Sequence, residues 1–206
     1  MARLDYPDCA HVADVMREFP QPLRNMNIGR MLSHAPTLTA PYYNTYAAAL
    51  QSLELDPKLR QLAILRVAER AGAEYVLVQH RALAKLAELT DEQISAAGEP
   101  AGGGACFTYV QRQVLAFTDA VLAGPRVSDA LFERIDRVLA PREIVELVLV
   151  IGWYWTACRL TTTLDIEPEH ALGHGVIAML QVEQDSARRK PWPPMTPPPS
   201  TPCISE

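Results

Sequence analysis

A long apolar segment near residue 150 constrains the fold of this chain more than any other feature. From Ile144 to Ala157 nearly every residue is apolar, and Glu146 carries the one charge. Pro141 just before the segment favours a helix start, because proline is tolerated at the first helical position. A helix that is apolar on all sides must be buried on all sides. The segment is also shorter than the roughly 18 residues that a membrane span needs.

Such a helix can be buried in two ways. It can lie at the centre of a single-chain bundle, or it can pack against a second copy of the chain. The chain has 206 residues, so we expect one domain, and a domain of this size has little room for a fully central helix. We therefore predict a homo-oligomer, because closed symmetric assemblies are the common outcome.

Helix start and stop signals recur along the rest of the chain. Asp56 and Pro57 are typical of a helix N-terminus, and Gly72 is typical of a helix end. No stretch shows the sustained alternation of a strand. The pattern predicts an all-α bundle of helical hairpins. The predicted helices run from about Ala40 to Leu53, Pro57 to Ala71, Glu74 to Glu88, Thr108 to Leu122, Ser128 to Leu139 and Arg142 to Leu164, with a short one around Ile94.

The C-terminal end differs from the rest of the chain in composition. Seven of the 17 prolines lie between Pro191 and Pro202. Proline lacks an N–H and fixes φ, so this stretch can form neither helix nor sheet. We therefore expect residues 1–185 to form a single domain and residues 186–206 to form an extended, disordered tail.

Charge and cysteine usage exclude several classes of protein. Lys and Arg number 19 against 24 Asp and Glu, a net charge of −5, so no nucleic-acid or anionic-membrane footprint is predicted. The four cysteines are scattered, which does not make a disulfide scaffold. The N-terminus has no signal-peptide pattern, and we expect a cytoplasmic protein. His170 and His174 have helical spacing but no evident third ligand, so no metal site is predicted.

His80 is the strongest candidate for chemistry. It follows Val76 and Leu77 by four and three residues and precedes Leu83 by three, which places the imidazole on the apolar face of its helix. Burial lowers the pKa of a histidine and a nearby carboxylate raises it, and either shift can suit proton transfer. The alternative is a core histidine that makes one hydrogen bond.

Several neighbours could act with His80. Glu74 and Tyr75 begin the same helix, where Glu74 could equally serve the helix N-terminus. Gln61 and Glu69 lie on the preceding helix, and a helical hairpin could bring either close to His80. Glu69 could equally be a solvated charge beside neighbouring arginines.

Arg159 and Trp155 are candidates for substrate binding in the second half of the chain. Arg159 follows an aromatic cluster that includes Trp155, and a guanidinium in such a place can clamp a carboxylate with two hydrogen bonds. The alternative for Arg159 is a structural salt bridge to Glu146 or Asp165.

The stretch from Leu55 to Ile94, LDPKLRQLAILRVAERAGAEYVLVQHRALAKLAELTDEQI, resembles the carboxymuconolactone decarboxylase family, which includes the alkylhydroperoxidase D-like proteins. The resemblance extends over roughly residues 28–170. It implies an all-α fold of helical hairpins assembled as trimers or hexamers. It also implies an active site around the motif histidine, His80, near the subunit contacts.

The chain departs from the redox branch of that family at two positions. The resemblance places a CxxC pair before the histidine, and the matching positions are Ala73 and Val76. Without a thiolate nucleophile there, no peroxidase cycle of that kind is expected. Gln61 stands where the family usually has glutamate, so a carboxylate relay is lost, although an amide can still hydrogen-bond a substrate carbonyl.

We therefore expect a cofactor-independent acid–base enzyme that decarboxylates, isomerises or otherwise rearranges a small cyclic or lactone-like metabolite in specialised or aromatic metabolism. In this hypothesis His80, Tyr75 and Glu74 are catalytic. Gln61, Glu69, Trp155 and Arg159 bind the substrate. Two alternatives stay open: a thiol-dependent peroxidase or reductase that uses Cys106 or Cys158, and a non-catalytic member of the family that binds a ligand or serves assembly.

Overall fold

The chain folds into helices joined by short loops. The structure is a computed structural model that describes residues 1–19, 21–99 and 105–169, and this part of the chain contains no strand. The prediction of an all-α fold is confirmed. The helices are α1 (Cys9–Val15), α2 (Gln21–Arg24), α3 (Asn27–Leu32), α4 (Pro36–Gln51), α5 (Pro57–Ala71), α6 (Glu74–Leu86), α7 (Asp91–Ala96), α8 (Tyr109–Ala123), α9 (Asp129–Asp136) and α10 (Pro141–Thr163).

Helices α5 and α6 form the hairpin that carries the site. The Asp56 side chain accepts hydrogen bonds from the backbone N–H groups of Lys58 and Leu59, which closes the N-terminus of α5. Gly72 ends α5 in the left-handed conformation with φ of 61°, which glycine adopts without steric cost. The chain then turns directly into α6. The predicted limits of both helices agree with the structure to within two residues.

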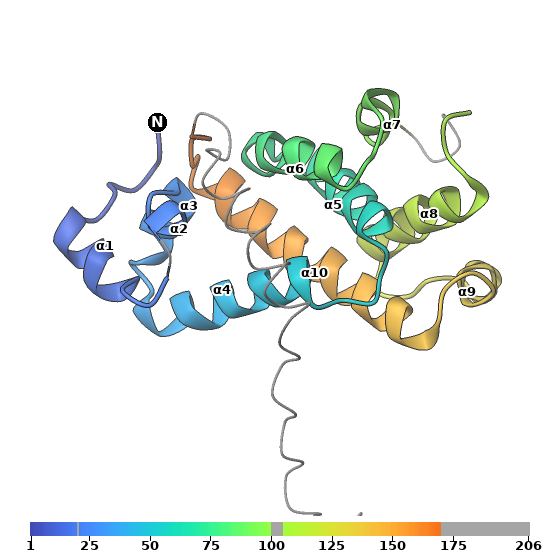
Figure 1. Cartoon of the computed structure of the whole chain (residues 1–206), viewed down its shortest axis with the longest axis horizontal. Helices are drawn as coiled ribbons and strands as arrows, with labels where there is room; N and C mark the ends of the chain where they lie inside the picture. The colour runs from blue at the N-terminus through green and yellow to red at the C-terminus, as the bar shows by residue number, and fades with distance from the viewer. Residues whose placement is uncertain (20, 100–104, 170–206) are drawn as a thin grey trace, which may run out of the picture.

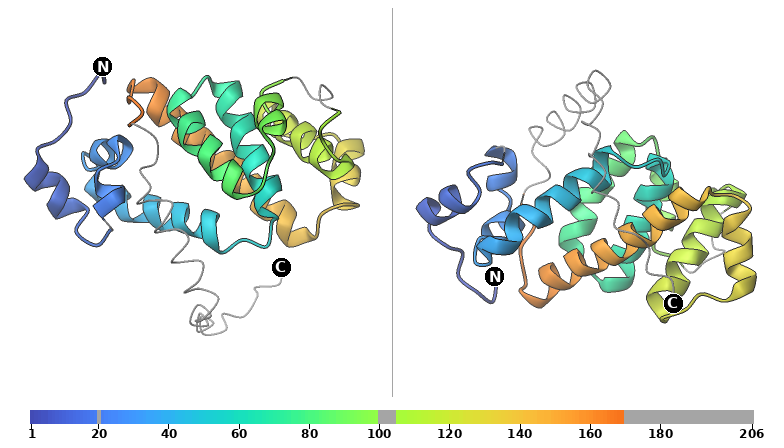
Figure 2. Two further views of the ribbon diagram at one scale, coloured as in Figure 1. Left: turned by 45° about the horizontal axis from the view of Figure 1, so that its top comes forward. Right: turned by 90° about the horizontal axis from the view of Figure 1, so that it is seen from below.

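Helix α10 is the longest of the described helices and spans the molecule. It runs from the end that carries α9 to the end that carries α3, and it packs most extensively against α5 (Figures 1 and 2). Glu146, the charge in its apolar run, is buried and accepts hydrogen bonds from the Leu55 N–H and the Arg142 guanidinium, both at 2.8 Å. This carboxylate therefore ties α10 to the start of α5.

One face of α10 remains exposed in the single chain. Val145, Val148 and Leu149 are 59%, 41% and 66% exposed, so the expected burial on every side is not reached within one copy. By length and composition alone, α10 could cross a membrane, but half of its apolar window is buried inside the protein. The core helix of a water-soluble protein passes the same test, and the contacts of α10 with α5 fit that description.

The N-terminal part of the chain contains three helices that the sequence analysis did not predict. Helix α1 begins after Asp8, whose side chain accepts from the His11 N–H. The segment that precedes α1 lies against the C-terminal end of α10, where the Arg3 N–H donates to the Leu164 carbonyl. Helix α4 begins at Pro36, earlier than expected, and continues through Pro41. The predicted tail at 186–206 lies outside the described residues.

Candidate functional site

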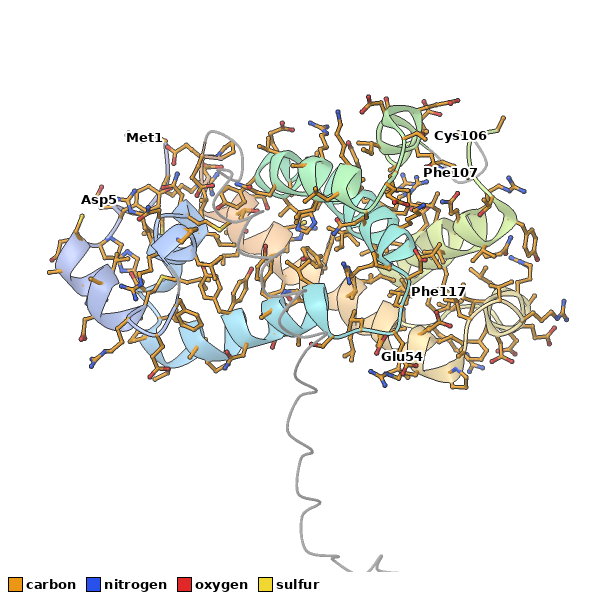
Figure 3. All side chains as sticks on the ribbon, viewed as in Figure 1. Met1, Asp5, Glu54, Cys106, Phe107 and Phe117 are labelled. Carbon is orange, nitrogen blue, oxygen red and sulfur yellow. The ribbon has the colours of Figure 1, made fainter. Side chains whose placement is uncertain are left out.

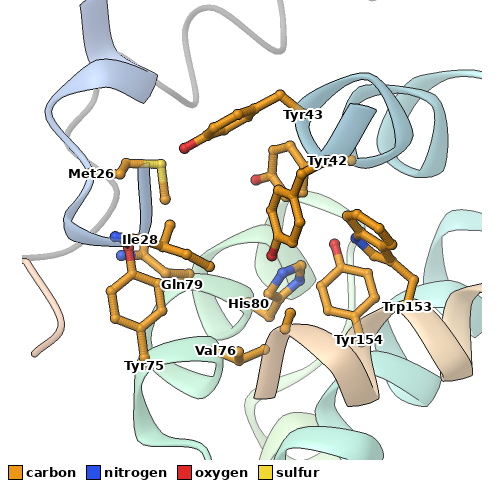
Figure 4. A pocket seen from close by; sticks show the side chains of 12 residues that line it. Met26, Ile28, Tyr42, Tyr43, Tyr75, Val76, Gln79, His80, Trp153 and Tyr154 are labelled. Atoms are coloured by element: carbon orange, nitrogen blue, oxygen red, sulfur yellow. Dashed lines mark hydrogen bonds between the residues drawn. The ribbon is translucent and has the colours of Figure 1, made fainter. Parts of the chain in front are cut away.

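A half-open pocket lies where α3, α4, α6 and α10 meet (Figure 4). Its empty volume is about 450 Å³ with the open mouth included, and water can occupy about 40 Å³ of it. That is room for a few water molecules, so a larger ligand must displace side chains of the wall or extend into the mouth. The wall residues are Met26, Ile28, Tyr42, Tyr43, Tyr46, Tyr75, Val76, Gln79, His80, Trp153, Tyr154 and Ala157.

His80 lies on α6 at the centre of this pocket and is 3% exposed. Its Nδ1 is 2.9 Å from Oε1 of Gln61, a buried side chain on α5. An amide oxygen accepts only, so this assignment puts the imidazole proton on Nδ1 and leaves the lone pair on Nε2. The hairpin thus holds one tautomer of His80.

The surroundings of His80 keep it neutral. Burial, and after it the positive charge of Arg60, lowers the pKa of His80 to about 3. Arg60 precedes Gln61 on α5 and is 6% exposed, so its charge is poorly screened by solvent. At neutral pH the imidazole is therefore uncharged, with an unprotonated lone pair on Nε2.

Aromatic side chains of α4 and α10 face His80 across the pocket. The Tyr154 ring stands nearly perpendicular to the imidazole, with 4.7 Å between ring centroids. Tyr42 packs on Trp153 with 4.4 Å between centroids. Burial raises the pKa of Tyr154 well above its ordinary value, so its hydroxyl stays protonated. The buried Tyr154 hydroxyl and the Trp153 indole N–H have no hydrogen-bond partner among the described residues.

Tyr75 lines the pocket but bonds away from His80. Its hydroxyl donates to the Glu169 carboxylate at 2.8 Å and accepts weakly from the Ile28 N–H at 3.4 Å. Gln79 Nε2 donates to the same carboxylate at 2.8 Å. Burial, and after it the Glu169 charge, raises the pKa of Tyr75. Tyr75 is therefore a neutral wall residue anchored to the segment that follows α10.

The other residues proposed from the sequence lie outside the pocket wall. Glu74 is exposed and pairs with Arg81 at 3.6 Å, and Glu69 pairs with the same arginine at 3.4 Å. The exposed Arg159 lies over the Trp155 ring, 4.1 Å from its centroid. The carboxylates of Glu146 and Asp165, its alternative partners, bind Arg142 and Arg3 instead. The structure thus brings Gln61, Tyr75 and His80 together and leaves the other four apart.

The described cysteines are poorly placed for thiolate chemistry. Cys158 is buried in α10, and burial raises the pKa of its thiol to about 12. Cys106 lies before α8, beside Phe107 (Figure 3). Burial is the main cause that raises the pKa of its thiol, and the negative charge of Glu92 is the second. Cys9 is exposed at the start of α1. Within residues 1–19, 21–99 and 105–169, no group of three or more His, Cys, Asp or Glu side chains could hold a metal ion.

Most of the aromatic wall is not predicted by the sequence. Tyr42 and Tyr46 are four residues apart, which puts them on one face of α4. That spacing was a usable signal, but it does not say which helix the face meets. Trp153 and Tyr154 belong to the aromatic cluster noted before Arg159, but nothing in the sequence places that cluster against His80.

Comparison with known proteins supports the resemblance found in the sequence. The model of the carboxymuconolactone decarboxylase family matches residues 36–108, a range that contains Gln61 and His80. No curated protein gives a significant match.

Solved structures share the fold at low identity. An alkylhydroperoxidase AhpD core, an uncharacterized peroxidase-related protein from Ralstonia eutropha JMP134, is 17% identical with a TM-score of 0.72, covering 82% of this chain and 93% of its own. A putative antioxidant defence protein AhpD from Agrobacterium tumefaciens is 19% identical with a TM-score of 0.63, and the match covers 68% of this chain and 95% of that protein. The debrominase Bmp8, as a cysteine-to-alanine variant in complex with 2,3,4-tribromopyrrole, is 18% identical with a TM-score of 0.63, and the match covers 87% of this chain and 96% of that protein. At these identities the likeness is one of fold.

Proposed function

Residues 36–108 belong to the carboxymuconolactone decarboxylase family, and from this premise we propose that the protein is a cofactor-independent acid–base enzyme acting on a small single-ring metabolite. The observation that carries the proposal is His80: a buried neutral imidazole whose Nδ1 is held by Gln61 and whose Nε2 carries the lone pair in an aromatic pocket. A base in this state removes a proton from carbon without first losing one of its own.

The proposed reaction begins with a proton on a ring carbon next to a carbonyl group. The C–H bond breaks, the proton moves to His80 Nε2, and the electron pair passes through the new C=C bond to the carbonyl oxygen. Return of the proton to another carbon completes an isomerisation. The same base also serves the decarboxylation of a ring carboxylic acid: Nε2 takes the carboxyl proton, the C–C bond breaks as carbon dioxide leaves, and Nε2–H then returns that proton to the carbanion. Gln61 positions His80 in this scheme and does not bind the substrate.

The pocket wall supports a flat ring as the substrate. The wall is dominated by aromatic and aliphatic side chains, and the described residues that form it include no Asp, Glu, Lys or Arg. A debrominase with the same fold has been seen with 2,3,4-tribromopyrrole, which is also a small flat ring. The proposed roles of Glu69, Glu74, Trp155 and Arg159 require a neighbouring subunit or another conformation, because these residues lie outside the wall.

The proposal is tested by solvent exchange. The protein is incubated in deuterium oxide with a panel of cyclic ketones, lactones and ring carboxylates, and incorporation of deuterium at carbon is followed by nuclear magnetic resonance. A variant with alanine at Cys9, Cys106, Cys158 and Cys203 separates acid–base from thiol chemistry. We expect this variant to exchange at the wild-type rate, because the pKa values of Cys106 and Cys158 are raised. Loss of exchange without the cysteines would instead support the thiol-dependent alternative.

We also propose that the protein is a homo-oligomer, a trimer or a hexamer, with the exposed face of α10 in the contact. Val145, Val148 and Leu149 form an apolar strip on that face. The Leu149→Glu variant is expected to shift the mass measured by light scattering to a smaller species. Leu38→Glu is the matched control, because Leu38 is 63% exposed on α4 against 66% for Leu149. A wild-type monomer, or equal behaviour of the two variants, would contradict the proposal.

A further inference from the structure

Two hydrogen-bond donors in the pocket have no acceptor among the described residues. These are the Tyr154 hydroxyl and the Trp153 indole N–H, whose Oη and Nε1 atoms are both buried. An indole N–H can only donate. Tyr154 is 2% exposed, and its raised pKa keeps the hydroxyl proton in place. Buried polar groups are nearly always paired, so two unpaired donors in one pocket require an explanation.

Both donors belong to the wall that faces His80. Trp153 and Tyr154 are consecutive on α10 and line the same pocket. In Figure 4 the Tyr154 hydroxyl and the Trp153 ring lie on the same side of the imidazole. The 4.7 Å between the Tyr154 and His80 ring centroids brings the phenol ring next to the base. A ligand that reaches Nε2 therefore lies against this wall.

The electrostatic environment favours a negative ligand. Arg60, only 6% exposed, is close enough to influence the charge states of both His80 and Tyr154. The buried Nε of its guanidinium has no hydrogen-bond partner among the described residues. The described residues of the pocket wall include no carboxylate, although Glu169 hydrogen-bonds the wall residues Tyr75 and Gln79, and Asp56 and Glu146 act on Arg60 from outside the wall. In a poorly solvated site, a fixed cation stabilises a nearby anion far more than it does in water.

We propose that Trp153 and Tyr154 form an oxyanion-binding pair, so that the pocket recognises a planar ring that carries an enolate or phenolate oxygen. This inference rests on the proposed function, because removal of a proton by His80 creates such an oxygen. The oxygen accepts from the Tyr154 hydroxyl and the Trp153 N–H, and Arg60 balances its charge. Donors placed in advance of the reaction stabilise the charge that develops in the transition state.

Ligand binding tests this pair without turnover. The probe is 4-nitrophenol, whose ionised form absorbs visible light, and nitrobenzene is the probe of similar shape without the hydroxyl group. We expect the wild-type protein to bind 4-nitrophenolate more tightly than nitrobenzene. Tyr154→Phe and Trp153→Phe are each expected to weaken binding of the phenolate by about tenfold or more, since each removes one hydrogen bond to a charged group. Binding of nitrobenzene should stay within about twofold of the wild-type value, because both variants keep an aromatic wall.

Tyr109→Phe is the matched control, because Tyr109 is exposed at the start of α8 and lies outside the pocket wall. It should bind both probes as the wild type does. Equal affinity of the wild type for the two probes, no binding of either, or unchanged phenolate binding in both pocket variants would overturn the inference. The proposed function fails separately, if His80→Gln exchanges protons at the wild-type rate while the phenolate still binds.

Discussion

The His80→Gln variant should exchange substrate protons about 100- to 10,000-fold more slowly than the wild type, which is the usual contribution of a positioned general base. Glutamine can still fill the buried site and hydrogen-bond Gln61, but its amide nitrogen has no lone pair available for a proton. The loss is expected in kcat more than in KM, because the aromatic wall that would hold the ring is unchanged. Deuterium incorporation at carbon, measured at several substrate concentrations, gives both constants.

The control for this loss is the same change at a histidine outside the site. His34 lies after α3, and its Nε2 contacts the Asp5 carbonyl at 2.9 Å. His34→Gln should keep the wild-type rate. Circular dichroism and binding of nitrobenzene show whether the His80 variant keeps its helices and its pocket. A folded His80→Gln protein with wild-type exchange would remove His80 from the reaction.

The pH profile of the wild type adds an independent check on the same base. With the pKa of His80 near 3, the imidazole is already neutral at about pH 5, so kcat/KM should stay level as the pH falls from about 8 to about 5. An ordinary histidine would lose activity below about pH 6.5. A fall in kcat/KM centred there, with the protein still folded, would mean that His80 is better solvated than the structure indicates.

Local signals in the sequence were enough for the hairpin that carries His80. Asp56, Pro57 and Gly72 define the limits of α5 through backbone chemistry that acts within one turn, so they can be read without knowledge of the fold. The same holds for His80, because the helical period alone places it on the buried face of α6. Its burial in the structure agrees with that prediction.

The remainder of the site depends on contacts between distant segments. Tyr42 on α4 and Trp153 on α10 meet only in the folded chain, and no pattern within either helix specifies that contact. Gln61 was expected to hold a substrate carbonyl, whereas its amide oxygen lies 2.9 Å from His80 Nδ1. The sequence placed the two on neighbouring helices, but the direction of an amide depends on which partner is nearest in the folded hairpin. The unpaired donors of Trp153 and Tyr154 are likewise a property of packing and have no signature in the sequence.

Acid should destabilise the wild-type protein through His80, and the His80→Gln variant should lack this contribution. In the folded protein the pKa of His80 is about 3, against about 6.5 in the unfolded chain. Between these values the unfolded state binds a proton that the folded state does not, so the free energy of unfolding falls as the pH falls. The slope from this one group approaches about 1.4 kcal/mol per pH unit. The folded protein is therefore most stable, as far as His80 is concerned, above about pH 6.5, and this stability is lost progressively as the pH falls toward about 3.

Urea unfolding at about pH 7 and about pH 4.5 gives the free energy of unfolding of the wild type and of His80→Gln at both pH values. The change between the two pH values is then compared between the two proteins. The wild type should lose roughly 2–3 kcal/mol more than His80→Gln between the two conditions, that is, two pH units at the slope of one proton. Carboxylates titrate in the same range, but they titrate in both proteins and largely cancel in the comparison. Any change in stability that the substitution causes at neutral pH also cancels. Parallel losses would show that His80 takes up its proton as easily in the folded protein as in the unfolded chain, and the neutral buried base on which the reaction depends would then be absent.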